Sequence, residues 1–394
     1  MTMDTHARFA GLLRRAAALA LAAVAAMAGC GGGVGVGGTG GFASGPITGF
    51  GSVIVNGIEF DDATAQVEDE DGGASAPGVL QLGMVVDVDS GPIGGSAAAP
   101  TAVAAHIRFG SEIVGPVDSV DMAAASLGVF GQTVAVTSTT VFDSRLTNGL
   151  ASVTVGSTLE VFGAFDAQRS RFVATRIAPR DSAVAFFKVR GPVRNLDPAA
   201  RTFAIGSLVL RYTAAPAGLA EGVIVRVRVE TTPVAGTWTV HAFGAGVRSL
   251  PDLDRARLRG PITTFSSSQQ FSVDGQPVDA SAASFPDGTA GLALGVEVDV
   301  EGPVAGGVLR ATQVEIDDNG GPQGGFELKG SIDEHFPALQ LFALRGVTVF
   351  YGAPGVEFDN GTATDLRVGV AVEARGVLSA NGTRLLATRI RFKN

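Results

Sequence analysis

The sequence predicts an all-β protein: a tandem array of about five small, OB-like five-stranded barrels, preceded by a signal peptide and a Gly-rich linker. Three observations favour this architecture. A short phrase around a Gly recurs every 66 to 76 residues, and each copy is followed by strands in which apolar and polar residues alternate. No window carries a sustained apolar stripe with the 3.6-residue period of a helix.

The composition limits the classes of protein that need considering. Of 394 residues, 46% are hydrophobic and 17% are charged; 55 are Gly and one is Cys. A single Cys excludes a disulfide framework and a Cys-rich metal site. The formal charge of -9 argues against a nucleic acid held by neutralisation of its phosphates. We therefore expect no nucleic-acid partner.

The first 29 residues predict a signal peptide. Arg8, Arg14 and Arg15 precede an unbroken apolar run of 13 residues, 16–28. At about 1.5 Å per residue such a helix is about 20 Å long, which is too short for the ~30 Å hydrocarbon core of a bilayer. The run is therefore typical of the apolar region of an export signal and not of a permanent span.

The only cysteine ends this run. Met27-Ala28-Gly29-Cys30 closely resembles the lipobox of bacterial lipoproteins, with Met27 in place of the commoner Leu. The resemblance implies cleavage before Cys30, a diacylglycerol thioether on that residue, and an anchor in the cell envelope. Because residue 31 is not Asp, it also implies the outer membrane of a Gram-negative bacterium. The alternative is an ordinary secretory peptide with an incidental Cys. Residues 30–45, rich in Gly, are predicted to form the lipidated start and a flexible tether.

A strand-like phrase built around one Gly opens each of five units. The phrases occupy residues 46–49, 113–117, 189–193, 258–262 and 328–332. Their reference glycines, Gly49, Gly115, Gly191, Gly260 and Gly330, are spaced by 66, 76, 69 and 70 residues. Such regular spacing predicts one structural unit repeated five times.

A strand of alternating residues follows in every unit. It begins at a Gly and covers residues 83–88, 156–161, 222–227, 295–300 and 369–374. In the fourth unit the even positions from Val296 to Val300 are Val, and the odd positions from Glu297 to Glu301 are acidic. A period of two predicts a strand with one buried face.

The ends of the units are marked by turns and by a closing strand. Asn-Gly and Asp-Gly pairs between strands predict hairpin turns. Most units end on Ala-x-x-Ile or Ala-x-x-Val, but the third lacks a clean copy and diverges most near Trp238 and His241. The predicted repeats are 46–110, 111–180, 186–250, 256–318 and 326–394.

The length of the units favours closed barrels. About 65 residues with five strands is enough for a small barrel, and closure leaves no sheet edge unpaired. The units are too short for the ~100-residue, seven-stranded sandwich. A solenoid whose repeats share sheet edges is the remaining alternative.

These units resemble the bacterial domain of unknown function family 5666, a repeat of exported proteins and lipoproteins. The first unit carries the most family-like stretches, residues 49–60 and 83–86, and the later units match by rhythm more than by letters. The resemblance covers nearly all of residues 46–392. It implies an OB-like small β fold and an envelope location, and it supplies no catalytic residues.

Residues that could carry chemistry are few, and we predict no catalytic residue, no cofactor and no metal site. The sequence contains no nucleophile elbow, no His-Glu-x-x-His and no P-loop. After the signal, the histidines are His106, His241 and His335, each in a different repeat. Their separation favours isolated surface or strand-end side chains.

Two acidic runs are candidate calcium sites. Residues 68–71 are all acidic, but taking Gly72 as the sixth position of an EF-hand loop places Val67 first, where a ligand is needed. We interpret this run as a solvated hairpin tip. Residues 317–321 are interpreted as a linker between repeats.

Aromatic and basic residues could mark a binding groove, because OB folds often bind nucleic acids or sugars on such surfaces. Most of the 23 Phe, such as Phe142, Phe271 and Phe358, fall at core-like strand positions. The Arg-rich stretches 226–228 and 254–259 have acidic neighbours. This favours a solvated face over an anion site.

The sequence thus favours a non-enzymatic envelope protein, anchored through a lipid at Cys30, whose repeats act as a binding or scaffold module. Repeated domains on one chain suit multivalent binding. Its expected partners are the membrane, through the lipid, and envelope proteins or polysaccharide. The alternative is a carbohydrate-binding or polysaccharide-processing accessory protein with a site between repeats, for which Trp238 is the first candidate contact.

Overall fold

The computed structural model describes residues 40–96, 99–180, 183–244, 246, 250–317 and 325–393. The predicted signal peptide, Cys30 and most of the predicted tether lie outside the described residues, as do residues 318–321. The helical segments found are short 3₁₀ turns: η1 (Pro77–Val79), η2 (Gly149–Ser152), η3 (Pro337–Leu339) and η4 (Ala363–Asp365). The all-β prediction is confirmed. Within the described ranges, no helix has the length and apolar character needed to cross a bilayer.

Barrel 2 (residues 113–179) shows the repeated unit most simply. Its strands are β9 (Ile113–Asp121), β10 (Ser126–Val129), β11 (Gln132–Ala135), β12 (Val141–Phe142), β13 (Thr158–Asp166) and β14 (Arg171–Pro179). β9 pairs antiparallel with β10 and β13, β10 with β11, and β13 with β14, while β11 pairs parallel with β14. The sheet therefore closes in the order β9-β10-β11-β14-β13-β9. The prediction of small closed five-stranded barrels is confirmed; the closer likeness to OB folds stays a prediction.

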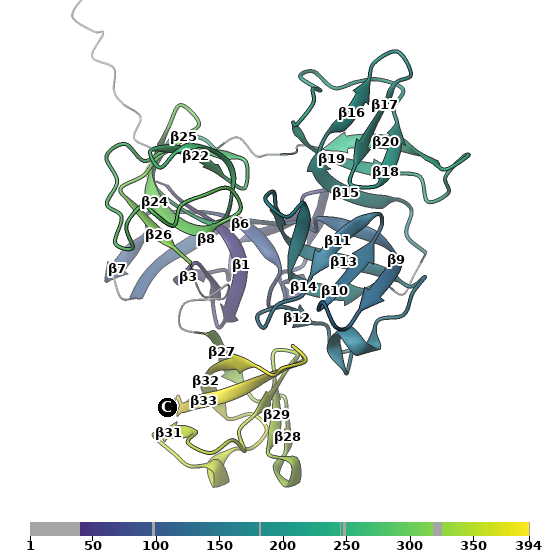
Figure 1. The fold of residues 1–394 in the computed structure, drawn as a ribbon. Coiled ribbons are helices and arrows are strands. Elements are labelled where there is room, and N and C mark those ends of the chain that lie inside the picture. The colour runs from purple at the N-terminus through teal and green to yellow at the C-terminus, as the bar shows by residue number, and fades with distance from the viewer. Residues whose placement is uncertain are drawn as a thin grey trace, which may run out of the picture. The chain divides into compact units, whose positions relative to one another are not determined.

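The other four barrels are built on the same plan (Figure 1). Barrel 1 contains β1 (Gly41–Phe50), β2 (Val53–Val55), β3 (Ile58–Asp61), β4 (Gln66–Asp69), β5 (Gly73–Ser75), β6 (Val85–Ser90), β7 (Gly94–Ser96) and β8 (Ala99–Phe109). Barrel 3 contains β15 (Phe187–Pro192), β16 (Arg194–Asp197), β17 (Thr202–Ile205), β18 (Leu208–Arg211), β19 (Ile224–Val229) and β20 (Thr237–Gly244). Barrel 4 contains β21 (Leu253–Ser267), β22 (Gln270–Val273), β23 (Gln276–Asp279), β24 (Glu297–Ala305), β25 (Val308–Arg310) and β26 (Gln313–Ile316). Barrel 5 contains β27 (Phe326–Ser331), β28 (Glu334–Phe336), β29 (Leu341–Leu344), β30 (Val347–Phe350), β31 (Glu357–Asp359), β32 (Ala371–Leu378) and β33 (Arg384–Phe392). A parallel pair corresponding to β11 and β14 recurs in each: β3–β8, β18–β20, β23–β25 and β30–β33.

One glycine fixes the turn before the alternating strand in all five barrels. Gly83, Gly156, Gly222, Gly295 and Gly369 have φ between +81° and +86°. Only Gly adopts this left-handed region without strain. Its amide donates a hydrogen bond of 2.7–2.9 Å to a carbonyl in the first strand (Ile47, Val117 or Ile262) or directly after it (Val193 or Ile332). The turn thus aligns the alternating strand against the first strand.

These hydrogen bonds correct the alignment of the first repeat. The accepting residue lies two positions after the reference Gly in the later repeats, as Val117 follows Gly115. In the first repeat the acceptor is Ile47, which lies two positions after Gly45 and not after Gly49. The first step is therefore 70 residues, from Gly45 to Gly115, and the repeat is more regular than the sequence phrase indicated.

The predicted tether, residues 30–45, includes residues that belong to the first barrel. β1 begins at Gly41, ahead of the expected boundary at residue 46, and Phe42 and Ala43 are 1% and 0% exposed. Residues 41–44 lie between β6 and β21 and pair with both. Gly-rich composition favoured a flexible segment, but two partner strands from distant parts of the chain hold it in a sheet.

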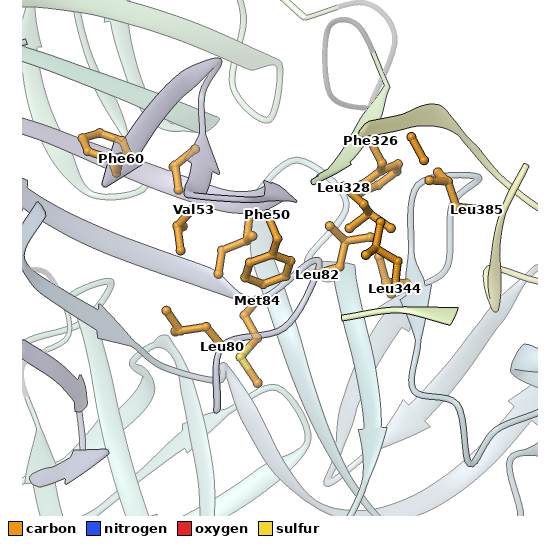
Figure 2. Packing of buried hydrophobic residues seen from close by; sticks show 14 of the residues in the cluster. Phe50, Val53, Phe60, Leu80, Leu82, Met84, Phe326, Leu328, Leu344 and Leu385 are labelled. Carbon is orange, nitrogen blue, oxygen red and sulfur yellow. The ribbon is translucent and has the colours of Figure 1, made fainter. Parts of the chain in front are cut away.

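The barrels are joined through their backbones and cores. β1 pairs in parallel with β21 of barrel 4 and with β27 of barrel 5, and β9 of barrel 2 pairs with β15 of barrel 3. Phe50 and Leu82 of barrel 1 belong to the same buried cluster as Leu328 and Leu344 of barrel 5 (Figure 2). The described residues therefore form one compact unit.

Candidate functional site

An acidic turn of barrel 1 contacts two basic side chains of barrel 3, Lys188 and Arg226. The turn between β4 and β5 carries Glu70 and Asp71. Asp71 Oδ2 lies 2.8 Å from Lys188 Nζ, and a Glu70 oxygen lies 3.6 Å from the same atom. Arg226 forms an ion pair with Glu70 and donates a 3.0 Å hydrogen bond to its carbonyl oxygen. Lys188 and Arg226 are 5% and 6% exposed, so each depends on these acidic partners.

Residues 68–71 belong to the β4–β5 hairpin and keep part of their surface in solvent, as predicted, but Glu70 and Asp71 also pair with cations of barrel 3. The prediction of a solvated face is wrong for Arg226, which is 6% exposed. Burial opposes ionisation of Asp71, but the ammonium of Lys188 holds the pKa of that carboxyl below its usual range. Asp71 and Lys188 are 117 residues apart in the sequence. Neither run shows by itself that it faces charges of the opposite sign.

A second buried cluster joins barrels 2, 3 and 4. Arg190 Nη1 lies 2.9 Å from Glu112 Oε1 and 3.4 Å from Asp274 Oδ2, and Arg190 Nε donates a 2.7 Å hydrogen bond to the Gly246 carbonyl. Burial raises the pKa of Glu112 to about 7, although Arg190 opposes the shift. Burial lowers the pKa of Arg190, but Asp274 and Glu112 together raise it above its ordinary value. Sequence reasoning missed this cluster, because its members come from three repeats.

The two clusters line a charged cavity of about 340 Å³. Its walls carry side chains of both signs, including Glu70, Glu112, Arg190, Arg226 and Asp274. Each of these five is paired with an opposite charge. Buried pairs of this kind fix orientation, because breaking one leaves an uncompensated charge in a dry environment. The ion pairs that line the charged cavity thus fix the positions of barrels 1 to 4 relative to one another.

A larger cavity of about 550 Å³, the apolar cavity, lies between barrels 2, 3 and 4. Its walls include Phe165 of barrel 2, Leu219 and Val223 of barrel 3, and Thr264 of barrel 4. Val223, in the loop before β19, is 41% exposed. Ligand sites are typically of this size, with mostly apolar walls and few polar groups.

The polar groups at the apolar cavity define what it could bind. Arg194 on β16 is exposed, and its side chain has no ion pair or hydrogen bond within the described part of the chain. On the barrel 4 side the hydroxyls of Thr264 and Ser272 lie 2.8 Å apart and bond to each other. A free guanidinium pairs best with a carboxylate or phosphate. The arrangement therefore suits an apolar molecule with one anionic group.

The three histidines lie apart. His241 Nδ1 is 3.3 Å from Glu230 Oε1, and its ring stacks on Phe186 with centroids 3.9 Å apart. His335 Nε2 lies 2.9 Å from the Tyr351 hydroxyl, and His106 sits half-buried on β8. In the ranges that the structure describes, no three His, Cys, Asp or Glu side chains gather as a metal site would require. Cys30, the predicted lipidation site, lies outside these ranges.

Trp238 is half-buried and packs against neighbouring aromatic rings. Its ring packs edge-on against Phe130 of barrel 2, with centroids 4.8 Å apart, and lies 5.8 Å from Phe187. Trp238 is thereby part of the apolar join between barrels 2 and 3. Phe142 and Phe271 are buried as core residues, 5% and 4% exposed. These contacts take up part of the Trp238 ring, which weakens the carbohydrate alternative.

The arginines of residues 254–259 are paired along barrel 4. Arg255 pairs with Glu301, Arg257 binds both oxygens of Asp299 at 2.9 Å, and Arg259 pairs with Asp317. Arg255 and Arg257 keep 42% and 27% of their side chains exposed, as a solvated face with acidic neighbours requires. The Arg259 side chain is only 9% exposed, so the prediction of a solvated face is wrong for it. Asp317 is 8% exposed, so the first residue of the predicted linker belongs to the barrel 4 ion-pair network.

Three segments of the chain match the protein family described as Domain of unknown function (DUF5666). They cover residues 114–178, 259–315 and 329–391. The segments fall in barrels 2, 4 and 5, each from the first main strand to the closing one. No curated protein matches the chain.

Proposed function

We propose that this chain, three segments of which match the DUF5666 family, is a non-enzymatic binding protein of the bacterial cell envelope. Its ligand would be an apolar molecule or partner segment that carries one anionic group. The observation that carries the proposal is the apolar cavity of about 550 Å³ with an unpaired Arg194 at its wall.

The joins between the barrels support this function. The cavity walls come from three barrels, so the cavity exists only while those barrels keep their spacing. The Arg190 cluster links the same three barrels through Glu112 and Asp274. A site that is rigid before binding loses less entropy when the ligand arrives. The contacts that join the barrels would thus also preserve the shape of the binding site.

The proposed location follows from the N-terminal sequence. A lipid on Cys30 would anchor the protein in the outer membrane. Ten residues, 31–40, separate Cys30 from the start of β1 at Gly41. At no more than about 3.5 Å per residue, the anchor lies within roughly 35 Å of the first barrel. The proposed partners are therefore the membrane and molecules near its surface, with no nucleic acid among them.

The binding proposal is tested with a probe of matching chemistry. Anilinonaphthalene sulfonate has an apolar body and one anionic group, and its fluorescence rises in an apolar site. We expect saturable binding to the protein without its signal peptide, a large loss in Val223→Asp, and weaker binding in Arg194→Gln.

The matched control is Val377→Asp on β32. Val377 is 53% exposed and does not line the apolar cavity. This variant should bind the probe like the parent protein. Equal binding by Val223→Asp and the parent would contradict the proposal.

A further inference from the structure

A third cavity, of about 190 Å³, lies where barrel 2 meets barrel 5, beside Gln81 and Leu82 of barrel 1, and is separate from the charged and apolar cavities. Barrel 2 contributes Arg176 on β14 and the loop after β12. Barrel 5 contributes the turn between β29 and β30 and the turn before β33. Beside it the Phe142 amide donates a 2.9 Å hydrogen bond to the Gly382 carbonyl, which joins the two barrels. The walls thus consist of strand ends and turns, and a backbone hydrogen bond links the two barrels beside them.

The charge of this cavity is unbalanced. Three arginines, Arg176, Arg345 and Arg384, and one carboxylate, Asp143, line it. Asp143 is already shared, with Oδ2 lying 2.7 Å from Arg176 Nη2 and Oδ1 lying 2.7 Å from Arg145 Nε. Among the residues described, neither the Arg345 nor the Arg384 guanidinium pairs with a carboxylate, although the Arg345 amide donates to Asp333 Oδ2 at 2.8 Å and Arg345 Nε donates to the Lys329 carbonyl at 3.0 Å. The lining therefore carries two positive charges in excess.

Arg176 is a buried cation with an unused donor. Its side chain is 5% exposed. Its Nη1 donates to the Leu82 carbonyl at 3.2 Å, while its Nε is buried and has no partner within the described ranges. A buried donor without a partner, in a region of excess positive charge, is unfavourable. An anion in the cavity would offset the charge.

Hydroxyl donors complete the lining. Ser144 and Thr348 face the cavity, and neither side chain has a hydrogen bond within the part of the chain that is described. Guanidinium and hydroxyl donors around one point are the groups that bind phosphate oxygens. A volume of 190 Å³ corresponds to about six waters of ~30 Å³ each, which suits one small anion with some water and excludes a lipid chain.

We propose that this oxyanion cavity binds one phosphate-type oxyanion, either free or as the head group of a phospholipid. The bound anion would strengthen the join between barrels 2 and 5, since its donors come from both. The proposal rests on a different cavity from the proposed function, and either can fail without the other.

The test is calorimetric titration of inorganic phosphate into the protein without its signal peptide at pH 7. We expect saturable binding, a loss of affinity of at least tenfold in Arg384→Gln and in Arg345→Gln, and partial retention in Arg384→Lys. Arg367→Gln is the matched control, because Arg367 is an exposed arginine of barrel 5 whose guanidinium donates to the Asp365 carbonyl and which lies outside the cavity. Circular dichroism and Trp238 fluorescence confirm that each variant is folded.

A second arm identifies the source of the anion. Co-sedimentation is measured with phosphatidylcholine vesicles, with and without one tenth phosphatidic acid. Binding of inorganic phosphate that Arg384→Gln weakens supports a free anion. Binding only to the phosphatidic acid vesicles, lost in Arg384→Gln, supports a lipid head group. The proposal is overturned if the parent binds neither probe saturably, or if Arg384→Gln binds as the parent does.

Discussion

Replacing Arg190 with Met removes the guanidinium that joins barrels 2, 3 and 4 while keeping a side chain of similar length. Arg190 pairs with Glu112 and Asp274 and donates to the Gly246 carbonyl. Glu112 is 6% exposed, and Arg190 is the one cation that pairs with it among the residues described. We expect the free energy of unfolding to fall by about 3–4 kcal/mol at pH 8, within the range for breaking one buried ion pair.

The magnitude has two parts. Without Arg190, Glu112 must be neutral in the folded protein, which at pH 8 costs about 4.8 kcal/mol from an ordinary pKa of 4.5. The pKa of about 7 in the parent already costs about 3.4 kcal/mol, so the variant loses about 1.4 kcal/mol more. Loss of the charged hydrogen bond to Gly246 adds roughly 1.5–3 kcal/mol.

The first part depends on pH. Because folding raises the pKa of Glu112 from 4.5 to about 7, its carboxyl lowers stability progressively as the pH rises between those values. At pH 5.5 it is protonated in the folded state of both proteins, so only the hydrogen-bond part remains. The loss at pH 5.5 should therefore be smaller by about 1.4 kcal/mol.

Urea unfolding followed by tryptophan fluorescence measures this loss. Trp238 is the only Trp of the chain, and its ring packs from barrel 3 against Phe130 of barrel 2. Adding Glu112→Gln to the Met variant should remove the pH-dependent part, because no carboxyl then needs protonation. A loss below about 1 kcal/mol at pH 8, or equal losses at both pH values, would refute this reasoning.

Three further predictions concern other parts of the chain. Gly156→Ala should lower the free energy of unfolding in urea by about 1–2 kcal/mol, because φ is +86° at this turn and an L residue is strained there. Nothing lies within 4 Å of the Cβ position, so the strain is in the backbone alone. An unchanged unfolding midpoint would contradict the claim that this turn requires a glycine. Burial raises the pKa of Glu297 from 4.5 to about 7, so its ionisation lowers stability as the pH rises through that interval. Glu297→Gln should therefore raise stability at pH 8 by up to about 3 kcal/mol and leave it unchanged near pH 4, as followed by circular dichroism; a gain of the same size at both pH values would contradict the assignment. Cys30→Ser should abolish labelling by a palmitate analogue, and undiminished labelling would exclude the lipid anchor.

The repeated unit is predictable because its determinants are local. Each alternating strand carries its own period of two, and each begins at a Gly such as Gly156 whose turn demands a positive φ. These features lie within a few residues of one another, so the chain displays them directly. Only the first repeat is misaligned, because Gly45 and Gly49 both precede a strand-like phrase and hydrogen bonding to Gly83 distinguishes them.

The joins between barrels are not predictable in this way. The sequence shows that Asp71 is acidic and Lys188 is basic, but their contact depends on how barrels 1 and 3 pack against each other. The same holds for Gly41 to Ser44, which resemble a linker until β21 is placed beside them. The three cavities lie at these joins and not within a repeat, so their lining residues left no local pattern.

The central claim is that the barrels form one joined unit, and amide hydrogen exchange tests it most directly. The amide of Arg190 donates to the Glu112 carbonyl at 2.9 Å, and that of Phe142 donates to the Gly382 carbonyl at 2.9 Å, so each crosses from one barrel to another. We predict that both amides exchange as slowly as those inside β9 and β14. Exchange of both within seconds, while the strands within each barrel stay protected, would show independent barrels and contradict the claim.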